Sequence, residues 1–285
     1  MKVTIIGMGL IGGSLAIDLK KRGYAEVIMG VGNTKETTQK ALDLKLIDRV
    51  VTLDEGIAEA DLIVLATPID VMISQLTYIL DRVSTQVVTD MGSAKFNLVK
   101  SVKDHPNRRR YVPSHPMAGT EYSGPSAAVP NLFDGKTAIL CDIEDSDKDA
   151  VTLVSRMYDV LKMNIIFMGA ENHDVHVAYV SHISHISSFI LAQTVLDKEK
   201  NEKNIFELAS GGFTSTVRLA KSSAKMWIPI FNQNTENIVT VLDSYIHNLQ
   251  QFRDLIARHD NQQLEQIIKE ANRIKDILDA KKQKS

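Results

Sequence analysis

Short apolar runs alternate with helical segments in the first part of the chain. We expect a helix over Gly13–Arg22 and strands over Val3–Ile6, Glu26–Val31, Leu62–Ala66, Gln86–Thr89 and Ala138–Leu140. Continuous apolar strands separated by helices are typical of a parallel sheet that is covered on both faces. The pattern predicts an α/β domain with a mostly parallel sheet.

From about residue 172 the pattern becomes wholly helical. Apolar residues recur at alternating spacings of four and three over 236–258, and a second amphipathic helix carries apolar positions from Leu264 to Leu278. Asp260 and Asn261 predict a break and an N-cap between them. We therefore divide the chain into a sheet domain, 1–168, and an all-helical domain, 169–285. These helices carry more apolar surface than so small a domain can bury, which predicts a homodimer.

Composition narrows the class of protein. The chain is 44% hydrophobic and 24% charged, as in ordinary globular proteins, and its net charge of −2 offers no field for nucleic acid or an anionic membrane. We expect the basic runs at 108–110 and 281–284 to be a solvated loop and tail. The single cysteine, Cys141, excludes an intramolecular disulfide, and no apolar run approaches the roughly 18 residues of a membrane span. A first strand starting at Lys2 leaves no room for a leader, so we expect a cytoplasmic protein.

A glycine motif joins the first strand to the first helix. Gly7 permits a tight turn, Gly9 lets a ligand approach the backbone, and Gly12 lets the helix pack on the strand. Leu10 and Ile11 open the helix, whose free N–H groups favour a phosphate. This placement predicts a dinucleotide site of the Rossmann type.

The end of the second strand leaves the cofactor open between NAD and NADP. An acid is expected there to hold the ribose hydroxyl of NAD, but Gly32 occupies its place. Asn33, Thr34 and Lys35 can accommodate a 2′-phosphate, although no arginine accompanies them. Gly12, in place of alanine, favours NAD.

The third strand ends at Thr67 and Pro68. Ligands bind at the carboxyl edge of such sheets, so both residues are expected beside the nicotinamide. The alternative is a proline that only ends the strand.

Four further stretches carry polar groups suited to catalysis. They are Asp90–Lys95 (DMGSAK), Ser114–Glu121 (SHPMAGTE), Ser181–His185 (SHISH) and Gly211–Arg218. With these stretches behind the glycine motif, the chain resembles prephenate and arogenate dehydrogenases over essentially its whole length. Ser184 departs from the family, which has proline before the second histidine.

The resemblance implies an NAD- or NADP-dependent oxidative decarboxylation of prephenate to 4-hydroxyphenylpyruvate, in tyrosine biosynthesis. Arogenate, which would give tyrosine directly, remains the alternative because both substrates share the ring and its carboxylate. His115 matches the family base that takes the hydroxyl proton, and an imidazole suits that task. Ser93 matches the serine that hydrogen-bonds this histidine and the substrate, close to the cofactor.

The resemblance also implies a binding site for a small dicarboxylate. Arg218 matches the arginine that holds a carboxylate, for which a guanidinium fork is suited. Ser181 and His185, four positions apart on a helix, are expected to share one cleft. Glu121 matches a gate residue near the entrance, and Trp227 lies either in the site or in the core.

Three other interpretations of the sequence have less support than this resemblance. A metal site would need carboxylates from facing elements, and only Asp174 and Glu171 lie near, so we expect none. A β-hydroxyacid dehydrogenase or imine reductase uses a catalytic lysine or lacks such a histidine pair, and an NAD sensor has no need of this combination of residues. The histidines that raise the metal hypothesis are His173, His176, His182 and His185.

Overall fold

The computed structural model describes residues 1–200, 202 and 204–282, with side chains described up to residue 280. The chain divides into two compact units, Met1–Thr235 and Glu236–Ser285. The basic tail at 281–284 lies outside the residues whose side chains are described.

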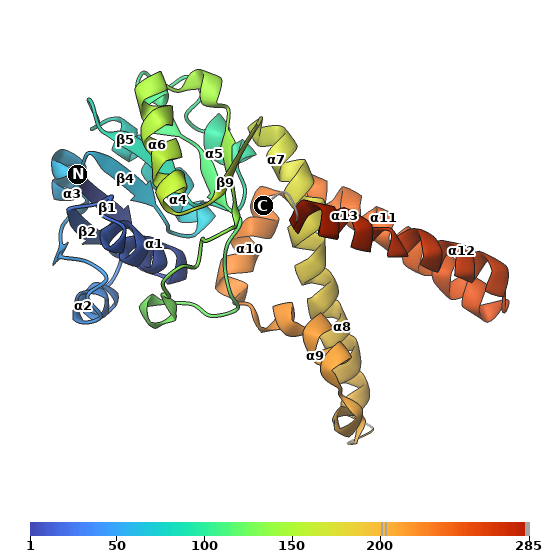
Figure 1. The fold of residues 1–285 in the computed structure, drawn as a ribbon. Coiled ribbons are helices and arrows are strands. Elements are labelled where there is room, and N and C mark those ends of the chain that lie inside the picture. Colours follow the sequence, from blue (N-terminus) through green and yellow to red (C-terminus); the bar gives the residue numbers. More distant parts are fainter. Residues whose placement is uncertain (201, 203, 283–285) are drawn as a thin grey trace. The chain divides into compact units, whose positions relative to one another are not determined.

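A six-stranded parallel sheet forms the centre of the first unit (Figure 1). Its strand order is β3-β2-β1-β4-β5-β6, and every neighbouring pair is parallel. The strands are β1 (Lys2–Ile6), β2 (Val27–Val31), β3 (Arg49–Val50), β4 (Leu62–Leu65), β5 (Val87–Asp90) and β6 (Tyr111–Val112). The predicted α/β class and parallel sheet are confirmed.

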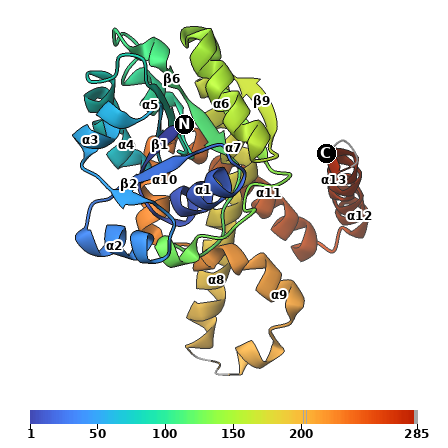
Figure 2. The ribbon, with the colours of Figure 1, turned by 60° about the vertical axis from the view of Figure 1, so that its left-hand side comes forward.

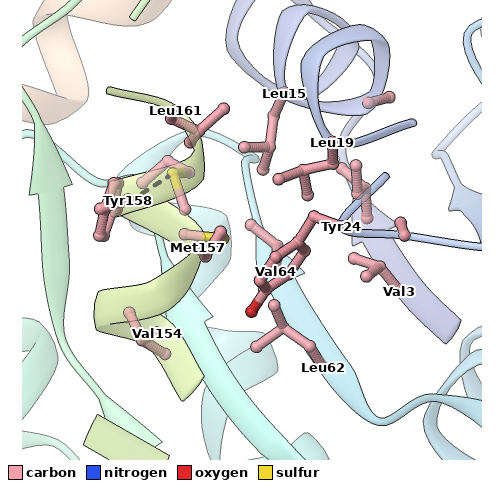
Figure 3. Packing of buried hydrophobic residues seen from close by; sticks show 14 of the residues in the cluster. Val3, Leu15, Leu19, Tyr24, Leu62, Val64, Val154, Met157, Tyr158 and Leu161 are labelled. Atoms are coloured by element: carbon pink, nitrogen blue, oxygen red, sulfur yellow. Dashed lines mark hydrogen bonds between the residues drawn. The ribbon is translucent and has the colours of Figure 1, made fainter. Parts of the chain in front are cut away.

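Helices cover both faces of this sheet because alternate strand residues point to opposite sides. One core cluster joins Val3 and Val64 to Leu15 of α1 and Met157 of α6 (Figure 3). The opposite cluster joins other residues of β1, β4 and β5 to α3, α4 and α5. The helices are α1 (Leu10–Lys21), α2 (Lys35–Asp43), α3 (Leu53–Glu59), α4 (Ile69–Leu80), α5 (Phe96–Lys100) and α6 (Lys148–Val160).

A second, three-stranded sheet lies outside the parallel one. It consists of β7 (Ser114–Pro116), β8 (Thr137–Cys141) and β9 (Asn164–Met168), with β7–β8 antiparallel and β8–β9 parallel. The strand expected at 138–140 exists, but its inclusion among the strands of the parallel sheet is wrong. Its partner β7 has only three residues and no apolar run, so no periodicity predicts it.

The helical part of the first unit begins with one continuous run. It is formed by α7 (Ala170–Val177), the π-helical turn η4 (Ala178–His182) and α8 (Ile183–Glu199). The chain then returns through η5 (Ile205–Leu208), α9 (Gly211–Thr216), η6 (Arg218–Lys221) and α10 (Ala224–Gln233). Both η5 and η6 contact α8. Figure 2 shows α8 on the outgoing part of this segment and α9 on the returning part.

The run Ala170–Glu199 is long and apolar enough to cross a membrane by length and composition only, and one such helix is weak evidence of a membrane span. A core helix of a soluble protein passes the same test. This run carries Ser181 and His185, whose surroundings are described below.

The second unit consists of α11 (Thr235–Ala257), α12 (Asn261–Asn272) and α13 (Ile274–Lys282). The break and cap at Asp260 are confirmed, since its carboxylate accepts a hydrogen bond from the Gln263 amide at 3.1 Å. The single helix predicted through Leu278 is wrong, because α12 ends at Asn272 and α13 starts at Ile274.

The basic run at 108–110 is not the solvated loop that was expected. Arg108 and Arg110 are buried, and only Arg109 is exposed. Arg108 donates to the Tyr111 carbonyl at 2.7 Å, and Arg110 donates to Asp149 at 2.8 Å. These contacts with the first turn of α6 and with β6 give two of the arginines structural roles.

Candidate functional site

A cavity of about 470 Å³ opens at the carboxyl ends of β1, β4 and β5. Ligands bind in this position in open parallel sheets. Its wall also includes β7 with the loop that follows it, the helical run, η6 and α10. The residues that the sequence analysis assigned to a site and that line the cavity are Gly9, Leu10, Ile11, Thr67, Pro68, Ser93, His115, Glu121, Ser181, His185 and Arg218.

The glycine loop forms one wall of the cavity. Gly7 has φ +101°, and a Cβ there would lie 2.6 Å from the Ala66 carbonyl oxygen. A Cβ on Gly12 would lie 2.0 Å from the Gly7 oxygen, whereas one on Gly9 would meet no atom within 4 Å. Gly7 and Gly12 therefore permit close backbone packing, and Gly9 leaves open space at the start of the 12-residue helix α1.

The residues expected around the cofactor ribose lie outside this cavity wall. Thr34 caps α2, because its hydroxyl accepts a hydrogen bond from the Thr37 amide at 3.2 Å. Asn33 is exposed. A Cβ on Gly32 would lie 2.6 Å from the Thr38 side chain, so an acid at this position would require Thr38 to move.

His115 lies on β7 opposite Ile139 and lines the cavity, although it is mostly buried. Its Nδ1 is 2.8 Å from Nε2 of His173, which leaves its own Nε2 for a ligand. Burial lowers the pKa of His115 well below its usual value, and the nearby His173, Lys95 and His182 lower it further. His115 is therefore neutral at pH 7 and able to accept a proton.

Ser93 lines the same cavity from the loop after β5. The hydrogen-bond partner that the structure gives to Nδ1 of His115 is His173, rather than the Ser93 expected from the resemblance. Ser93 and His115 therefore line one cavity, while Nδ1 of His115 makes its hydrogen bond with His173.

The charged groups of the opposite wall form a pair. Arg218 lies 3.6 Å from Glu121, and its side chain is 55% exposed. The Glu121 side chain is only 18% exposed, but an ion pair 3.6 Å long with so exposed an arginine contributes at most about 1 kcal/mol, so Arg218 is available to a competing carboxylate.

His185 and Ser181 occupy neighbouring turns of the helical run and both line the cavity. Nδ1 of His185 donates to the Ser181 carbonyl at 3.0 Å, and the ring stacks on Trp227 at 3.8 Å between centroids. Burial lowers the pKa of His185, and Arg218 lowers it further. His182 is buried instead and lies 3.3 Å from the Asn234 amide nitrogen, outside the cavity wall.

Trp227 belongs to both the core and the site. It is 5% exposed and lines the cavity, and its Nε1 has no hydrogen-bond partner among the residues that the structure describes. Buried donors are nearly always paired. This one therefore suits an acceptor on a bound ligand.

A buried charge cluster lies behind the wall that carries Ser93 and His115, and sequence reasoning assigned it no role. Asp90 accepts from Tyr111 at 2.6 Å and from the Gly92 amide at 2.7 Å, and it pairs with the fully buried Lys95. Ser114, next to His115, donates to the Asp90 carbonyl at 2.7 Å. The opposite charges that flank Ser93 in the DMGSAK stretch were the available signal.

The metal hypothesis finds no support within the described part of the chain, which holds no group of three or more potential ligands. His173 contacts His115 and Asp174, whereas His176 is exposed.

Family models match most of the chain. Residues 15–167 match "prephenate dehydrogenase, nucleotide-binding domain", and residues 169–270 match "prephenate dehydrogenase, dimerization domain".

Individual relatives agree with this match. A prephenate dehydrogenase of Bacillus subtilis is 31% identical over 98% of this chain and 76% of its own length. The structure of the A. aeolicus prephenate dehydrogenase with hydroxyphenyl propionate and NAD+ matches with a TM-score of 0.86 and 32% identity, over 95% of this chain and 96% of that one. Synechocystis arogenate dehydrogenase matches with a TM-score of 0.74 and 27% identity, over 97% and 99%.

Proposed function

The chain belongs to the prephenate dehydrogenase family, and from this we propose that it is an NAD-dependent dehydrogenase that converts prephenate to 4-hydroxyphenylpyruvate with release of CO₂. The observation that carries the proposal is the single cavity in which His115, Arg218 and the Gly9 loop meet. The product would serve tyrosine biosynthesis.

NAD fits the glycine-loop wall. The open space at Gly9 and the N-terminus of α1 suit its pyrophosphate, with Leu10 and Ile11 in the first turn. Thr67, Pro68 and Ser93 would then lie along the nicotinamide end. The bound cofactor supplies the hydride acceptor.

The base of the reaction is His115. Its Nε2 takes the proton of the ring hydroxyl while the hydride leaves the same carbon, and Ser93 hydrogen-bonds that hydroxyl. Because burial keeps the pKa of His115 low, the neutral base is present throughout the physiological pH range.

The dicarboxylate is held on the opposite wall. Arg218 exchanges Glu121 for a substrate carboxylate, and Glu121 acts at the entrance. Ser181 and His185 line the other end of the substrate. The unpaired Nε1 of Trp227 supplies a further donor.

The chain would act as a cytoplasmic homodimer that joins through its helices. Residues 169–270 match a dimerization domain. Large apolar side chains remain exposed on the helical elements, among them Val180, Ile190, Ile246 and Leu249. A second copy covering them would remove their apolar surface from water. Light scattering at micromolar concentration should give twice the mass of one chain, and a monomer would contradict the dimer.

The substrate is tested by following NADH formation with prephenate and with arogenate in parallel. A kcat/KM at least tenfold higher for prephenate supports the proposal. The reverse preference would make the chain an arogenate dehydrogenase, as in the Synechocystis relative. No reduction with either substrate would refute the assigned reaction.

A further inference from the structure

His115 is the first member of a buried chain of three side chains. Its Nδ1 lies 2.8 Å from Nε2 of His173, and Nδ1 of His173 lies 2.7 Å from Oδ1 of Asp174. His173 is fully buried and Asp174 is 1% exposed. These three hydrogen-bonded side chains connect β7, on the cavity wall, to α7.

Backbone donors hold the far end of this chain in place. Oδ1 of Asp174 accepts from the Lys95 amide at 2.7 Å, and Oδ2 accepts from the Phe96 amide at 2.9 Å. Both oxygens are therefore acceptors, and the carboxylate has no freedom to rotate away from His173. The same loop carries Ser93 into the cavity, so one carboxylate fixes the loop and meets the histidine pair.

The hydrogen-bond directions follow from this arrangement. An ionised carboxylate can only accept, so Nδ1 of His173 must carry a proton and donate it to Asp174. Nε2 of a neutral His173 is then an acceptor, so Nδ1 of His115 must carry the proton between the two rings. Nε2 of His115, on the cavity side, is left without a proton.

The surrounding charges keep both rings neutral at pH 7. Lys95, from the loop after β5, and His182, from η4, face His115 and lower its pKa beyond the effect of burial. Burial also lowers the pKa of His173, which is partly offset by Asp174 and by Asp90. Over the physiological pH range each ring therefore carries a single proton, on either Nδ1 or Nε2.

We infer that His173 and Asp174 are positioning residues that hold neutral His115 in its Nδ1–H tautomer, with Nε2 free to take the substrate proton. This inference rests on the proposed function for the use of that nitrogen, but the tautomer itself belongs to the free protein. When His115 gains a proton, the resulting cation faces the Asp174 carboxylate through His173.

The first experiment needs neither a substrate nor a destabilising variant. Long-range ¹H–¹⁵N correlation spectra of the full-length protein, labelled at histidine nitrogens, report which ring nitrogen carries each proton. His115→Asn identifies the His115 signals by their loss. We expect Nδ1–H tautomers at His115 and His173 near pH 7. A neutral Nε2–H tautomer at His115 would overturn the inference, whether or not the chain oxidises prephenate.

The second experiment is the substitution Asp174→Asn. An amide presents a donor where a carboxylate only accepts, so it permits the wrong tautomer. We expect kcat to fall by about 10²–10⁴-fold, while KM and the Kd of NAD stay within about twofold. The acid limb of kcat/KM should move to lower pH, because the charge that raises the pKa of His173 is lost. His176→Asn, at an exposed position of the same helix, is the matched control.

A purely structural role for Asp174 gives a different pattern. Activity would then fall only with the folded fraction measured by circular dichroism, and the acid limb would stay at its wild-type position. That result, or an unchanged His115 tautomer in Asp174→Asn, would overturn the inference. If no substrate is turned over, the proposed function fails, and the spectra still decide the tautomer.

Discussion

On the glycine-loop side of the cavity the important groups are backbone atoms, whereas on the side of β7 and the helical run they are side chains. Gly7 and Gly12 permit contacts that a Cβ would block, and Gly9 leaves room for a ligand. Opposite them, His115, His185 and Arg218 present ring nitrogens and a cation. Binding on the first side therefore depends on the space around the backbone, and chemistry on the second depends on charge and protons.

The largest effect is expected from His115→Asn, which removes the proposed base and leaves the glycine loop intact. We expect kcat to fall by roughly 10²–10⁴-fold with prephenate, because a general base contributes about that much. The Kd of NAD, measured by fluorescence titration, should stay unchanged. A loss of less than fivefold at neutral pH would show that His115 is not the base.

Arg218→Ala tests whether charge holds the substrate. A hydrogen bond to a charged group contributes about 1.5–3 kcal/mol, so KM should rise roughly 10- to 150-fold. Some loss of kcat should accompany this, because the ring would be less well oriented, while NAD affinity stays the same. Steady-state kinetics with unchanged KM would place Arg218 outside the site.

Two alanine substitutions in the glycine loop separate space for the fold from space for the ligand. Gly12→Ala places a Cβ against the Gly7 carbonyl, and overpacking of this kind costs about 1–3 kcal/mol of unfolding free energy or more. Gly9→Ala meets no protein atom, so it should leave thermal stability unchanged and weaken NAD binding. Equal effects of both variants on stability would contradict this division.

The smallest effect concerns the buried histidine outside the cavity. Burial lowers the pKa of His182 to about 4, whereas the pKa of a histidine in an unfolded chain is roughly 6.5. The unfolded state therefore takes up the proton first, and stability present above pH 6.5 is lost as the pH falls toward 4. From pH 7 to pH 5 this amounts to about 2 kcal/mol.

Urea unfolding at both pH values checks this loss. His182→Gln should flatten the pH dependence, even if it lowers stability at pH 7, whereas His176→Asn should leave the dependence as in the wild type. An equally steep loss in His182→Gln would assign the effect to other groups.

Most of the fold could be predicted from local patterns in the sequence. The strand at Val3–Ile6, the glycine loop and the cap at Asp260 depend on neighbouring residues, so periodicity and spacing find them. The strand β7 could not be predicted in this way, because the residues of β8 with which it pairs lie more than twenty positions away. The break at Arg273 could not be predicted either, since the apolar spacing continues across it.

The candidate site divides in the same way. His115, Ser93 and Arg218 lie in stretches with recognisable spacing, and the structure brings all three to one cavity. The contact of His115 with His173 spans 58 positions, and the sequence alone related His173 only to a metal hypothesis that lacked facing carboxylates. Arg110 shows the same limit, because its partner Asp149 is 39 positions away.

The π-helical turn at Ala178–His182 interrupts one continuous helical run that carries two sets of residues with proposed roles. His173 and Asp174 precede the turn, Ser181 lies within it and His185 follows it. Each residue of a regular helix advances the azimuth by roughly 100°, so deleting one residue here would rotate one set relative to the other by about that angle. Such turns are rare and are frequently found at functional sites. In evolutionary terms, the number of residues in this segment is constrained more strongly than their identity. Substitutions can accumulate along its exposed face, but an insertion or deletion between the two sets would put them out of phase.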